Sequence, residues 1–413
     1  AEGAENQVVF RIVDPLEEEG HDPVEAVALG HQQVAVGLLL GIAAGGGAVE
    51  QGGQGLSFGC KRRVAEILAA ADFGLAMSVI NTHNVANHLA RSAAPELTRH
   101  VLPALLSGER TGCTALTEPG AGSDFSAITT LARRAGDEWL IDGRKAWIVN
   151  ATHADVVVVY AQTAPGSGAR GIAAFVVDGS RSGFVRDPRS DSTAAPGIDA
   201  GGFQLQAYRA RADELLHPPG EAFKAALASI NGARTYVAAM CCGMVEECLR
   251  VASAYGAVRH SFGKPLHEHQ GWRWSLADAA IELEASRLLV DAAASRIDGG
   301  SDAQTAAARA KVFATRMAGR HIAALMHAMG AEGLRETQPF QRHLAAGGRD
   351  LVMALHAAHG HGKFKCHHVA SLPGAFFVPG ILAARSSDSA VKATPISQEQ
   401  SRLRGDDPGT PLE

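Results

Sequence analysis

The sequence predicts an α+β protein that is mainly α-helical, and this fold class follows from three stretches of different periodicity. Residues 1–110 are predicted to form an N-terminal helical domain, residues 111–218 a middle antiparallel β-barrel or sandwich, and residues 219–385 a C-terminal helical bundle. A length of 413 residues corresponds to about two to three domains. Residues 386–413 are rich in Ser, Pro and Arg, and we expect a mostly disordered tail there.

The first domain is predicted from apolar residues at helical spacing. Val64, Ile67, Leu68 and Ala71 follow this spacing, and helix-forming residues continue over positions 73–90. Residues 43–59 interrupt the pattern, because they contain too many glycines to remain helical. We expect them to form a long loop between helices.

Short β-branched runs predict the middle domain. Residues 139–141 lead through Asp142-Gly143 into residues 145–149, which is a hairpin signal. Further strands are expected at residues 155–162, 171–177 and 203–209. Several short strands without intervening helices favour an antiparallel barrel or sandwich over a βαβ unit.

Long helices are expected again in the last domain. Residues 221–261, 270–298 and 303–329 consist mostly of good helix formers with apolar stripes. Glycines at 299–300 and within 330–333 end two of these stretches.

Composition and charge exclude several classes of protein. The net charge of −5 and the pI near 6.4 argue against a nucleic-acid-binding protein, which usually carries a basic face. No apolar run is long enough for a membrane span, and the N-terminus lacks a signal-peptide pattern. Six cysteines without CxxC spacing indicate a reduced, cytoplasmic protein.

Residues 111–126 (TGCTALTEPGAGSDFS) hold the densest group of residues suited to binding. Residues 119–122 favour an open turn with outward N–H groups, and Thr114, Thr117 and Ser123 add hydroxyls. Such a surface suits a planar polar ring or a phosphate. The alternative is a hairpin connection whose hydroxyls cap helices. It is not a Walker loop, because no Gly-Lys-Ser/Thr follows.

Three motifs in one order point to a known family. TALTEPGAGSD at 114–124, GDEWLIDGRKAWIVNATHAD at 136–155 and RHSFGKPLHEHQ at 259–270 together resemble the acyl-CoA dehydrogenases. The resemblance runs from about residue 25 to about residue 350. It implies a four-helix bundle as the last domain, FAD as cofactor, and an acyl-CoA or acyl-carrier-protein thioester as substrate. It also implies a homodimer or homotetramer, with an electron-transfer partner or oxygen as electron acceptor.

The resemblance assigns residues to the cofactor and the substrate. Ser123 is expected near the FAD pyrophosphate and the thioester, and Arg234 is the family's characteristic arginine beside the substrate. Val149 stands where the family has a hydroxyl residue that bonds the flavin. Arg259, Phe262 and Gln270 are expected to reach the FAD of a neighbouring subunit. The remaining residues expected at the flavin are Leu116, Thr117, Gly122, Trp147 and Ile148. Without the motifs, Trp147 would be read as strand core and Arg259 as a solvated charge.

The catalytic base of the family is missing from both of its usual positions. A glutamate takes the α-proton while the β-hydride passes to the flavin. Here Ala357 stands at one base position, or Ala358 if the alignment slips by one residue, and Ala233 stands at the other. His356 or His359 is therefore a candidate base, because histidine accepts a proton near neutral pH.

Other interpretations of this segment remain open. A metal site among the histidines at 356–368 is a weaker one, because glycines break the spacing and no carboxylate accompanies them, so we predict no metal. A second possibility is that the segment is polar and has no catalytic role. A third is that residues 351–385 come from a shifted reading frame.

Three functions follow from these observations. The first is dehydrogenation of an acyl thioester. The second keeps the flavin and the thioester but changes the chemistry, for example to oxygenation, elimination or isomerisation. The third is a catalytically silent subunit that scaffolds an active homologue.

Overall fold

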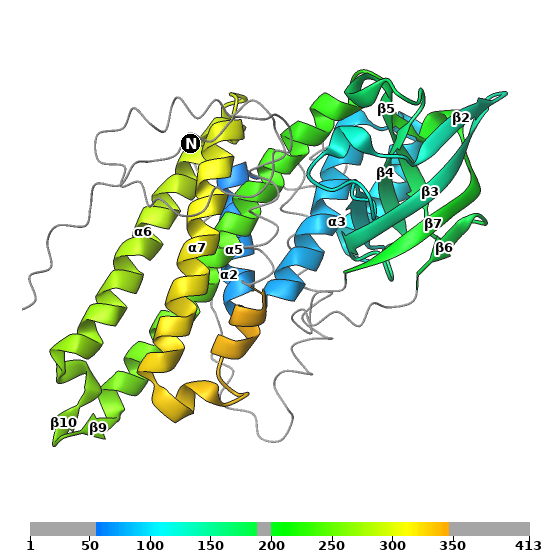
Figure 1. The fold of residues 1–413 in the computed structure, drawn as a ribbon. Helices are drawn as coiled ribbons and strands as arrows, with labels where there is room; N and C mark the ends of the chain where they lie inside the picture. Colours follow the sequence, from blue (N-terminus) through cyan, green and yellow to red (C-terminus); the bar gives the residue numbers. More distant parts are fainter. Residues whose placement is uncertain (1–54, 188–199, 347–413) are drawn as a thin grey trace, which may run out of the picture. The chain divides into compact units, whose positions relative to one another are not determined.

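The computed structural model describes residues 55–187 and 200–346, and the described part begins with three helices (Figure 1). These are α2 (Phe58–Ala71), α3 (Phe73–Ser92) and α4 (Pro95–Ser107). The Ser57 and Asp72 side chains cap α2 and α3 by accepting hydrogen bonds from backbone N–H groups. The helices predicted from apolar spacing are thus confirmed. Of the loop predicted at 43–59, residues 55–57 precede α2, residues 58–59 are helical, and the rest lies outside the described residues.

Eight strands form one sheet in the middle of the chain, in the order β6-β7-β3-β2-β4-β5-β8, with β1 beside β4. The strands are β1 (Gly112–Ala115), β2 (Leu131–Ala135), β3 (Glu138–Val149), β4 (Val156–Gln162), β5 (Ile172–Asp178), β6 (Phe184–Arg186), β7 (Ala200–Ala210) and β8 (Leu215–His217). The strands predicted at 155–162, 171–177 and 203–209 are present as β4, β5 and β7. Most pairings are antiparallel as predicted, but β1 pairs parallel with β4, and β2 touches β4 in parallel at one residue pair.

The hairpin predicted at Asp142-Gly143 is wrong. β3 continues through both residues, and its register against β7 shifts between Ile141 and Gly143. The hairpin turn lies earlier, at residues 136–137 between β2 and β3, with Gly136 at φ 64°. Gly143 serves close packing instead, because a Cβ there would lie 2.6 Å from the Thr130 hydroxyl oxygen.

The β4 strand is buried on both of its faces, which explains its uninterrupted apolar run. Val156, Val158 and Tyr160 belong to a core shared with α3 and α4, whereas Val157 and Val159 belong to a second core among the strands. Because side chains alternate between faces of a strand, both sets must be apolar. The β-domain is therefore packed against the N-terminal helices through β4.

The C-terminal helices confirm the predicted stretches to within a few residues. They are α5 (Ala222–Val258), α6 (Gln270–Asp298) and α7 (Gln304–Ala328), and residues 340–346 are also helical. A short hairpin, β9 (His260–Ser261) and β10 (Lys264–Pro265), joins α5 to α6 through the 3₁₀ turn η4 (Leu266–Glu268). The remainder of the predicted bundle and the tail at 386–413 lie outside the described residues.

Helix α5 runs from the β-domain to the β9–β10 hairpin. Its 37 residues span about 55 Å. Ala222 and Ala226 in its first turns belong to the core under β4 and β5, while its last turn contacts η4 and β10 (Figure 1). A residue near the start of α5 and a residue in the β9–β10 hairpin therefore cannot share one small-molecule site within a single chain.

Candidate active site

The segment that follows β1 forms a closed turn on the surface of the β-domain. The N–H of Glu118 donates to the Ala121 carbonyl at 2.9 Å, and the N–H of Ala121 donates to the Glu118 carbonyl at 3.2 Å. Pro119 and Gly120 form the exposed tip, whereas Ala121 is buried and its N–H is used within the turn, so of the N–H groups predicted to point outward over residues 119–122 only those of Gly120 and Gly122 are left. The Thr117 carbonyl accepts from Ala146 N–H at 3.1 Å, which attaches the turn to β3.

A buried ion pair lies directly beneath this turn. The Lys145 ammonium donates to Glu118 Oε1 at 2.9 Å and to the Leu116 carbonyl at 3.1 Å. The Lys145 and Glu118 side chains are only 1% and 3% exposed. Glu118 also accepts from the N–H and hydroxyl of both Thr129 and Thr130, at 2.6–2.9 Å.

The surroundings of this pair lower the pKa of both groups. Burial raises the pKa of Glu118, but the Lys145 charge and the hydrogen bonds outweigh it and bring the pKa to about 2. Burial lowers the pKa of Lys145 to about 8, against the opposing effect of Glu118. Neither residue was predicted for the site, although Glu118 and Lys145 stand within the motifs at 114–124 and 136–155.

Trp147 projects from β3 beside the turn. The register of β3 against β7 shifts between Lys145 and Ile148, so Trp147 bulges out of the strand with φ 60°. Its side chain is 61% exposed, whereas Ile148 is 4% exposed and packs in the β-domain core. Trp147 is therefore not strand core. The Ile148 side chain, in contrast, is committed to the core, so only its backbone faces the side on which Trp147 projects.

The end of β3 is fixed to α3 and β1. Asn150 is buried at φ 69°, and its side-chain amide donates to the carbonyls of Ser78 and Gly112 at 3.0 and 3.1 Å. Val149, just before it, is half-buried and brings no hydroxyl to this position. Positive φ is common for asparagine but unfavourable for tryptophan, so the backbone strain at this strand end lies at Trp147.

The distal part of the turn is open. Gly122 is exposed and Ser123 half-buried, and a Cβ at Gly120 or Gly122 would meet nothing within 4 Å. Leu116 and Thr117 are half-buried at the root of the turn. Backbone N–H groups, hydroxyls and an exposed indole thus share one side of the β-domain. These residues fit a flat ring that carries an anionic chain.

Arg234 lies near the start of α5, in a region of buried polar groups. It is buried, its guanidinium donates to Asn231 Oδ1 at 3.2 Å, and burial lowers its pKa. Two residues later Tyr236 packs against Phe58, with ring centroids 4.5 Å apart and the ring planes tilted by 35°. Ala233 is half-buried and offers no carboxylate.

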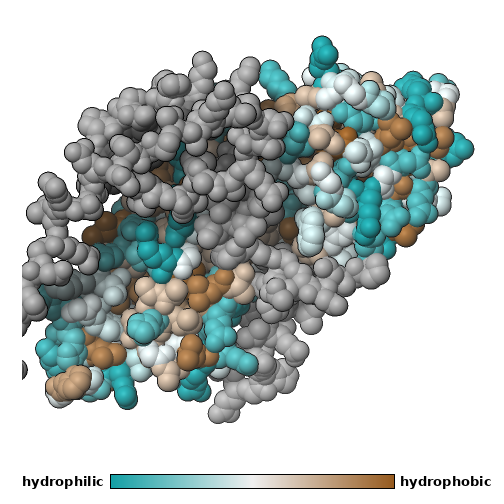
Figure 2. Space-filling model, viewed as in Figure 1, coloured by the Kyte–Doolittle hydropathy of each residue, from teal (hydrophilic) through white to brown (hydrophobic). Residues whose placement is uncertain are grey.

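Arg259, Phe262 and Gln270 are not brought to the turn. All three are exposed at the β9–β10 end of the bundle, and Phe262 is 95% exposed at φ 50°. Figure 2 shows apolar patches among polar residues on the bundle surface. The predicted residues thus form two groups at opposite ends of α5. His356, His359 and Ala357 lie outside the described residues.

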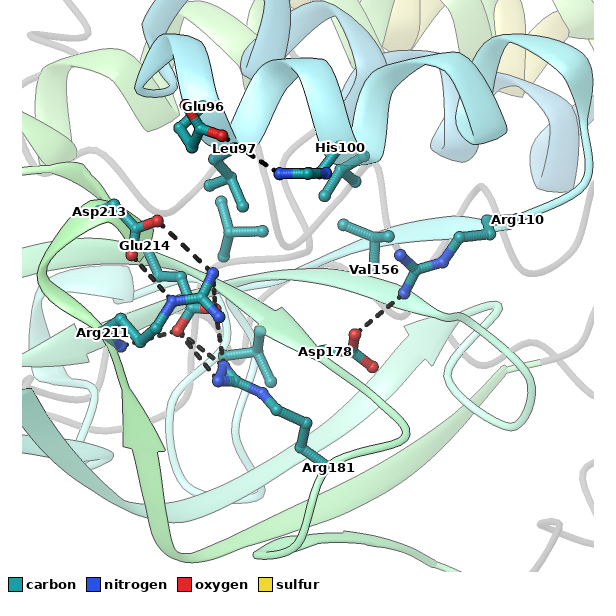
Figure 3. Close-up of a pocket in the computed structure, with 13 residues that line it drawn as sticks. Glu96, Leu97, His100, Arg110, Val156, Asp178, Arg181, Arg211, Asp213 and Glu214 are labelled. Atoms are coloured by element: carbon teal, nitrogen blue, oxygen red, sulfur yellow. Dashed lines mark hydrogen bonds and ion pairs between the residues drawn. The ribbon is translucent and has the colours of Figure 1, made fainter.

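A cavity of about 440 Å³ lies elsewhere, between α4 and the β-domain (Figure 3). Its charged side chains pair with one another: Arg110 with Asp178 at 3.2 Å, and Arg181 with Glu214 at 2.7 Å. None of the residues predicted for the site lines it. Because these charges are already matched, the cavity offers a ligand little that the internal pairs do not use.

Over residues 55–187 and 200–346, no helix has the length and apolar character needed to cross a bilayer. Within the same ranges, His, Cys, Asp and Glu do not gather in groups of three that would hold a metal ion.

Comparison with known proteins places the chain in a family. Three consecutive models match: Acyl-CoA dehydrogenase, N-terminal domain (residues 9–109), middle domain (113–208) and C-terminal domain (220–346). The chain is 34% identical to the mitochondrial short-chain specific acyl-CoA dehydrogenase of Bos taurus over 273 residues, and this aligned region covers 66% of each chain. Identity to the Homo sapiens protein of the same name is 33% over 296 residues, which cover 71% of this chain and 72% of that one.

Solved structures are similar as well. Butyryl-CoA dehydrogenase from Megasphaera elsdenii superposes with a TM-score of 0.73 at 28% identity, covering 78% of this chain and 88% of that one. A structure titled PigA with FAD and proline superposes with a TM-score of 0.75 at 22% identity, over 82% of this chain and 92% of that one. The second likeness concerns the fold alone.

Proposed function

Because the chain belongs to the acyl-CoA dehydrogenase family, we propose that it is an FAD-dependent oxidoreductase of acyl thioesters, carried by CoA or an acyl carrier protein. The observation that carries the proposal is the exposed, strained Trp147 beside the anchored turn at residues 116–123. A large aromatic side chain gains little from exposure to water, so it is understood best as one wall of a ring-binding site.

The described residues would hold FAD as follows. Leu116, Thr117 and Trp147 flank the ring, and Ile148 and Val149 contribute backbone. Gly122 and Ser123 approach the pyrophosphate, where N–H groups and a hydroxyl stabilise negative charge. When bound, FAD supplies the acceptor for the β-hydride of the substrate. Val149 cannot donate the hydroxyl hydrogen bond of the family pattern.

The α-proton requires a base, and our proposal for it is His356 or His359. At the other family position, the half-buried Ala233 carries no acidic group. Arg234, next to it, is proposed to face the substrate. A histidine variant should then lose the reaction while keeping the bound flavin. His356→Ala and His359→Ala, each tested for turnover and for flavin content, separate the two candidates.

The test of the proposed function is the visible spectrum of the purified chain. After incubation with FAD and desalting, the protein should keep the flavin absorbance, and anaerobic addition of acyl-CoA thioesters should bleach it. Protein that stays colourless would overturn the proposal. The bovine and human relatives are named short-chain specific, so a butyryl thioester belongs in the first panel.

A second function is favoured by the losses at Ala233 and Val149. It keeps FAD and the thioester but changes the chemistry, for instance to oxygenation, elimination or isomerisation. Mass analysis of the products separates the two, since only dehydrogenation removes two hydrogens. A flavin-binding protein that changes no thioester and fails to be reduced would support the third function, a silent scaffold subunit.

We also propose that the chain works as a homodimer or homotetramer in which Arg259, Phe262 and Gln270 reach the FAD of a neighbour. Their position at the far end of α5 supports this. So does an outward apolar stripe on α6, formed by Trp274, Ile281 and Leu288 at heptad spacing and each more than 60% exposed. Light scattering after size-exclusion chromatography tests it, and a monomer would contradict it.

The electron acceptor and the compartment are further parts of the proposal. An electron-transfer protein or oxygen would reoxidise the flavin, and comparing turnover with an artificial acceptor and with oxygen distinguishes them. Residues 55–187 and 200–346 contain five cysteines and no disulfide, which supports a reducing, cytoplasmic setting.

A further inference from the structure

We propose that Glu118 and Lys145 are positioning residues that hold the two flavin-facing segments in register, so that losing either one weakens FAD binding. The inference rests on the proposed function, because it concerns the same site. We refer to Glu118, Lys145, Thr129 and Thr130 together as the Glu118 clamp.

The Glu118–Lys145 pair connects the two flavin-facing segments. Lys145 stands two residues before Trp147 on β3, and its ammonium donates to both Glu118 and the Leu116 carbonyl. Ala146 between them donates to the Thr117 carbonyl. The turn that carries Leu116 and Thr117 and the strand that presents Trp147 are therefore joined at this one point.

The Glu118 carboxylate is held by hydrogen bonds to both of its oxygens. Oε1 accepts from Lys145 Nζ and from the N–H and hydroxyl of Thr130, while Oε2 accepts from the N–H and hydroxyl of Thr129. Thr130 reaches this position because Gly143 leaves room for it on β3. Five donors around one buried carboxylate fix its position, and with it the backbone of Glu118.

Removing either Glu118 or Lys145 should disturb the turn. Because both side chains are almost completely buried, a single substitution leaves an uncompensated charge, or forces a proton change, beneath the turn. The turn must then move or admit water. A cofactor site that depends on the spacing between the turn and Trp147 loses affinity when that spacing relaxes.

A second ion pair in the same domain provides a matched control. Arg181 and Glu214 pair at 2.7 Å, with the Glu214 side chain 5% exposed, but they join β7, η3 (Ala212–Glu214) and the β5–β6 connection. Their side chains bond to each other and to Tyr208, Arg209 and Arg211, which lie outside both flavin-facing segments. Arg181→Met should therefore lower the melting temperature without changing FAD affinity.

The experiment measures the FAD dissociation constant of the full chain at a temperature where circular dichroism shows every variant folded. Glu118→Gln and Lys145→Met should each weaken FAD binding on the order of tenfold, the effect typical of outer partners that orient ligands in metal sites. The double variant should lose less than the sum of the two single losses, because it leaves no unpaired charge. The visible circular dichroism of any bound flavin should change in the single variants.

Thr130→Val is the milder variant, used if Glu118→Gln fails to fold. It removes one hydroxyl donor from the clamp with little change of volume, and it should weaken FAD binding by about threefold or more. If the folded clamp variants bind FAD as the wild type does, or lose no more affinity than Arg181→Met, the inference is wrong while the proposed function stands. If the wild type binds no FAD, both are wrong.

Discussion

Two buried carboxylates in this protein are each held by several donors, but one fixes a turn and the other lies between helices. Glu118 in the β-domain pairs with one lysine and four donors from two threonines, all of which fix a turn. Glu66 on α2 pairs with three arginines, at 3.2 Å to Arg62, 2.8 Å to Arg63 and 2.7 Å to Arg287. The first network orders a loop, and the second ties α2 to α6 where regular helices already exist.

The comparison shows how the same physical device serves different ends. Helices α2 and α6 are stable as elements, so the Glu66 network adds to packing that an apolar core already supplies. The turn at residues 116–121 contributes only Ala121 and the half-buried Leu116 to an apolar core, so we expect its geometry to depend more on the ion pair beneath it. We therefore expect damage at Glu66 to affect stability and damage at Glu118 to affect the cofactor.

The largest effect should come from the bundle network. Glu66→Gln removes the buried anion that three arginines share and leaves them only the more exposed Asp291 and Glu246 as partners, so it should lower the free energy of unfolding by about 3 kcal/mol. Urea denaturation measures it. Glu138→Gln, which breaks an exposed pair with Arg209, is the control and should change stability by less than about 0.5 kcal/mol. Equal losses in the two variants would contradict the comparison.

A close contact at the end of the bundle gives the next effect. A Cβ at Gly256 on α5 would overlap the Trp272 ring, whose indole N–H donates to the Ala328 carbonyl at 3.0 Å. Gly256→Ala should therefore cost about 2 kcal/mol by overpacking. Gly271→Ala on α6, where a Cβ meets nothing within 4 Å, should be neutral or slightly stabilising. Thermal melts of both variants would show no difference if the ring moves freely.

Helix periodicity made most of the fold predictable, and non-local contacts account for what was not. The stripes of α5, α6 and α7 repeat within one segment, so the sequence reveals them. Asp142-Gly143 reads locally as a turn, but Thr130 packs against Gly143 and pairing with β7 keeps the strand extended. The true turn at 136–137 follows β2, whose sequence LARRA has two adjacent arginines and gives little strand signal.

The candidate site divides in the same way. The turn and Trp147 were expected from the resemblance, since both stand in contiguous motifs. The pairing of Glu118 with Lys145 joins residues 27 positions apart, and no local pattern specifies it. Ile148 was expected beside the ring, but alternation around the bulge turns its side chain into the core.

Lowering the pH should destabilise the packing between the N-terminal helices and the β-domain. Burial, with the charges of His217 and Arg91, lowers the pKa of His88 to about 4, against about 6.5 in the unfolded chain. Below pH 6.5 the unfolded state binds a proton that the folded state does not, so stability falls as the pH drops toward 4. At pH 5.5 the loss should be about 1 kcal/mol. His88→Asn should reduce this dependence of the urea midpoint between pH 7 and pH 5 without abolishing it, because burial also lowers the pKa of His343 to about 4, and an unchanged slope would contradict the assignment.

The smallest effect concerns the strain at Trp147. Asparagine tolerates positive φ better than tryptophan, so Trp147→Asn should raise the stability of the cofactor-free protein by about 0.5 kcal/mol while weakening FAD binding. Melting curves without FAD and titrations with FAD measure the two halves. A variant that is both less stable and equally able to bind FAD would show that the indole serves the fold and not the cofactor.

Equilibrium dialysis of FAD against the wild type, Glu118→Gln and Glu66→Gln tests the central claim most directly, at a temperature where all three are folded. The wild type and Glu66→Gln should retain FAD with the same affinity, and Glu118→Gln should retain it on the order of tenfold more weakly. Equal retention by all three would contradict the role of the Glu118 clamp, and retention by none would contradict the flavin site itself.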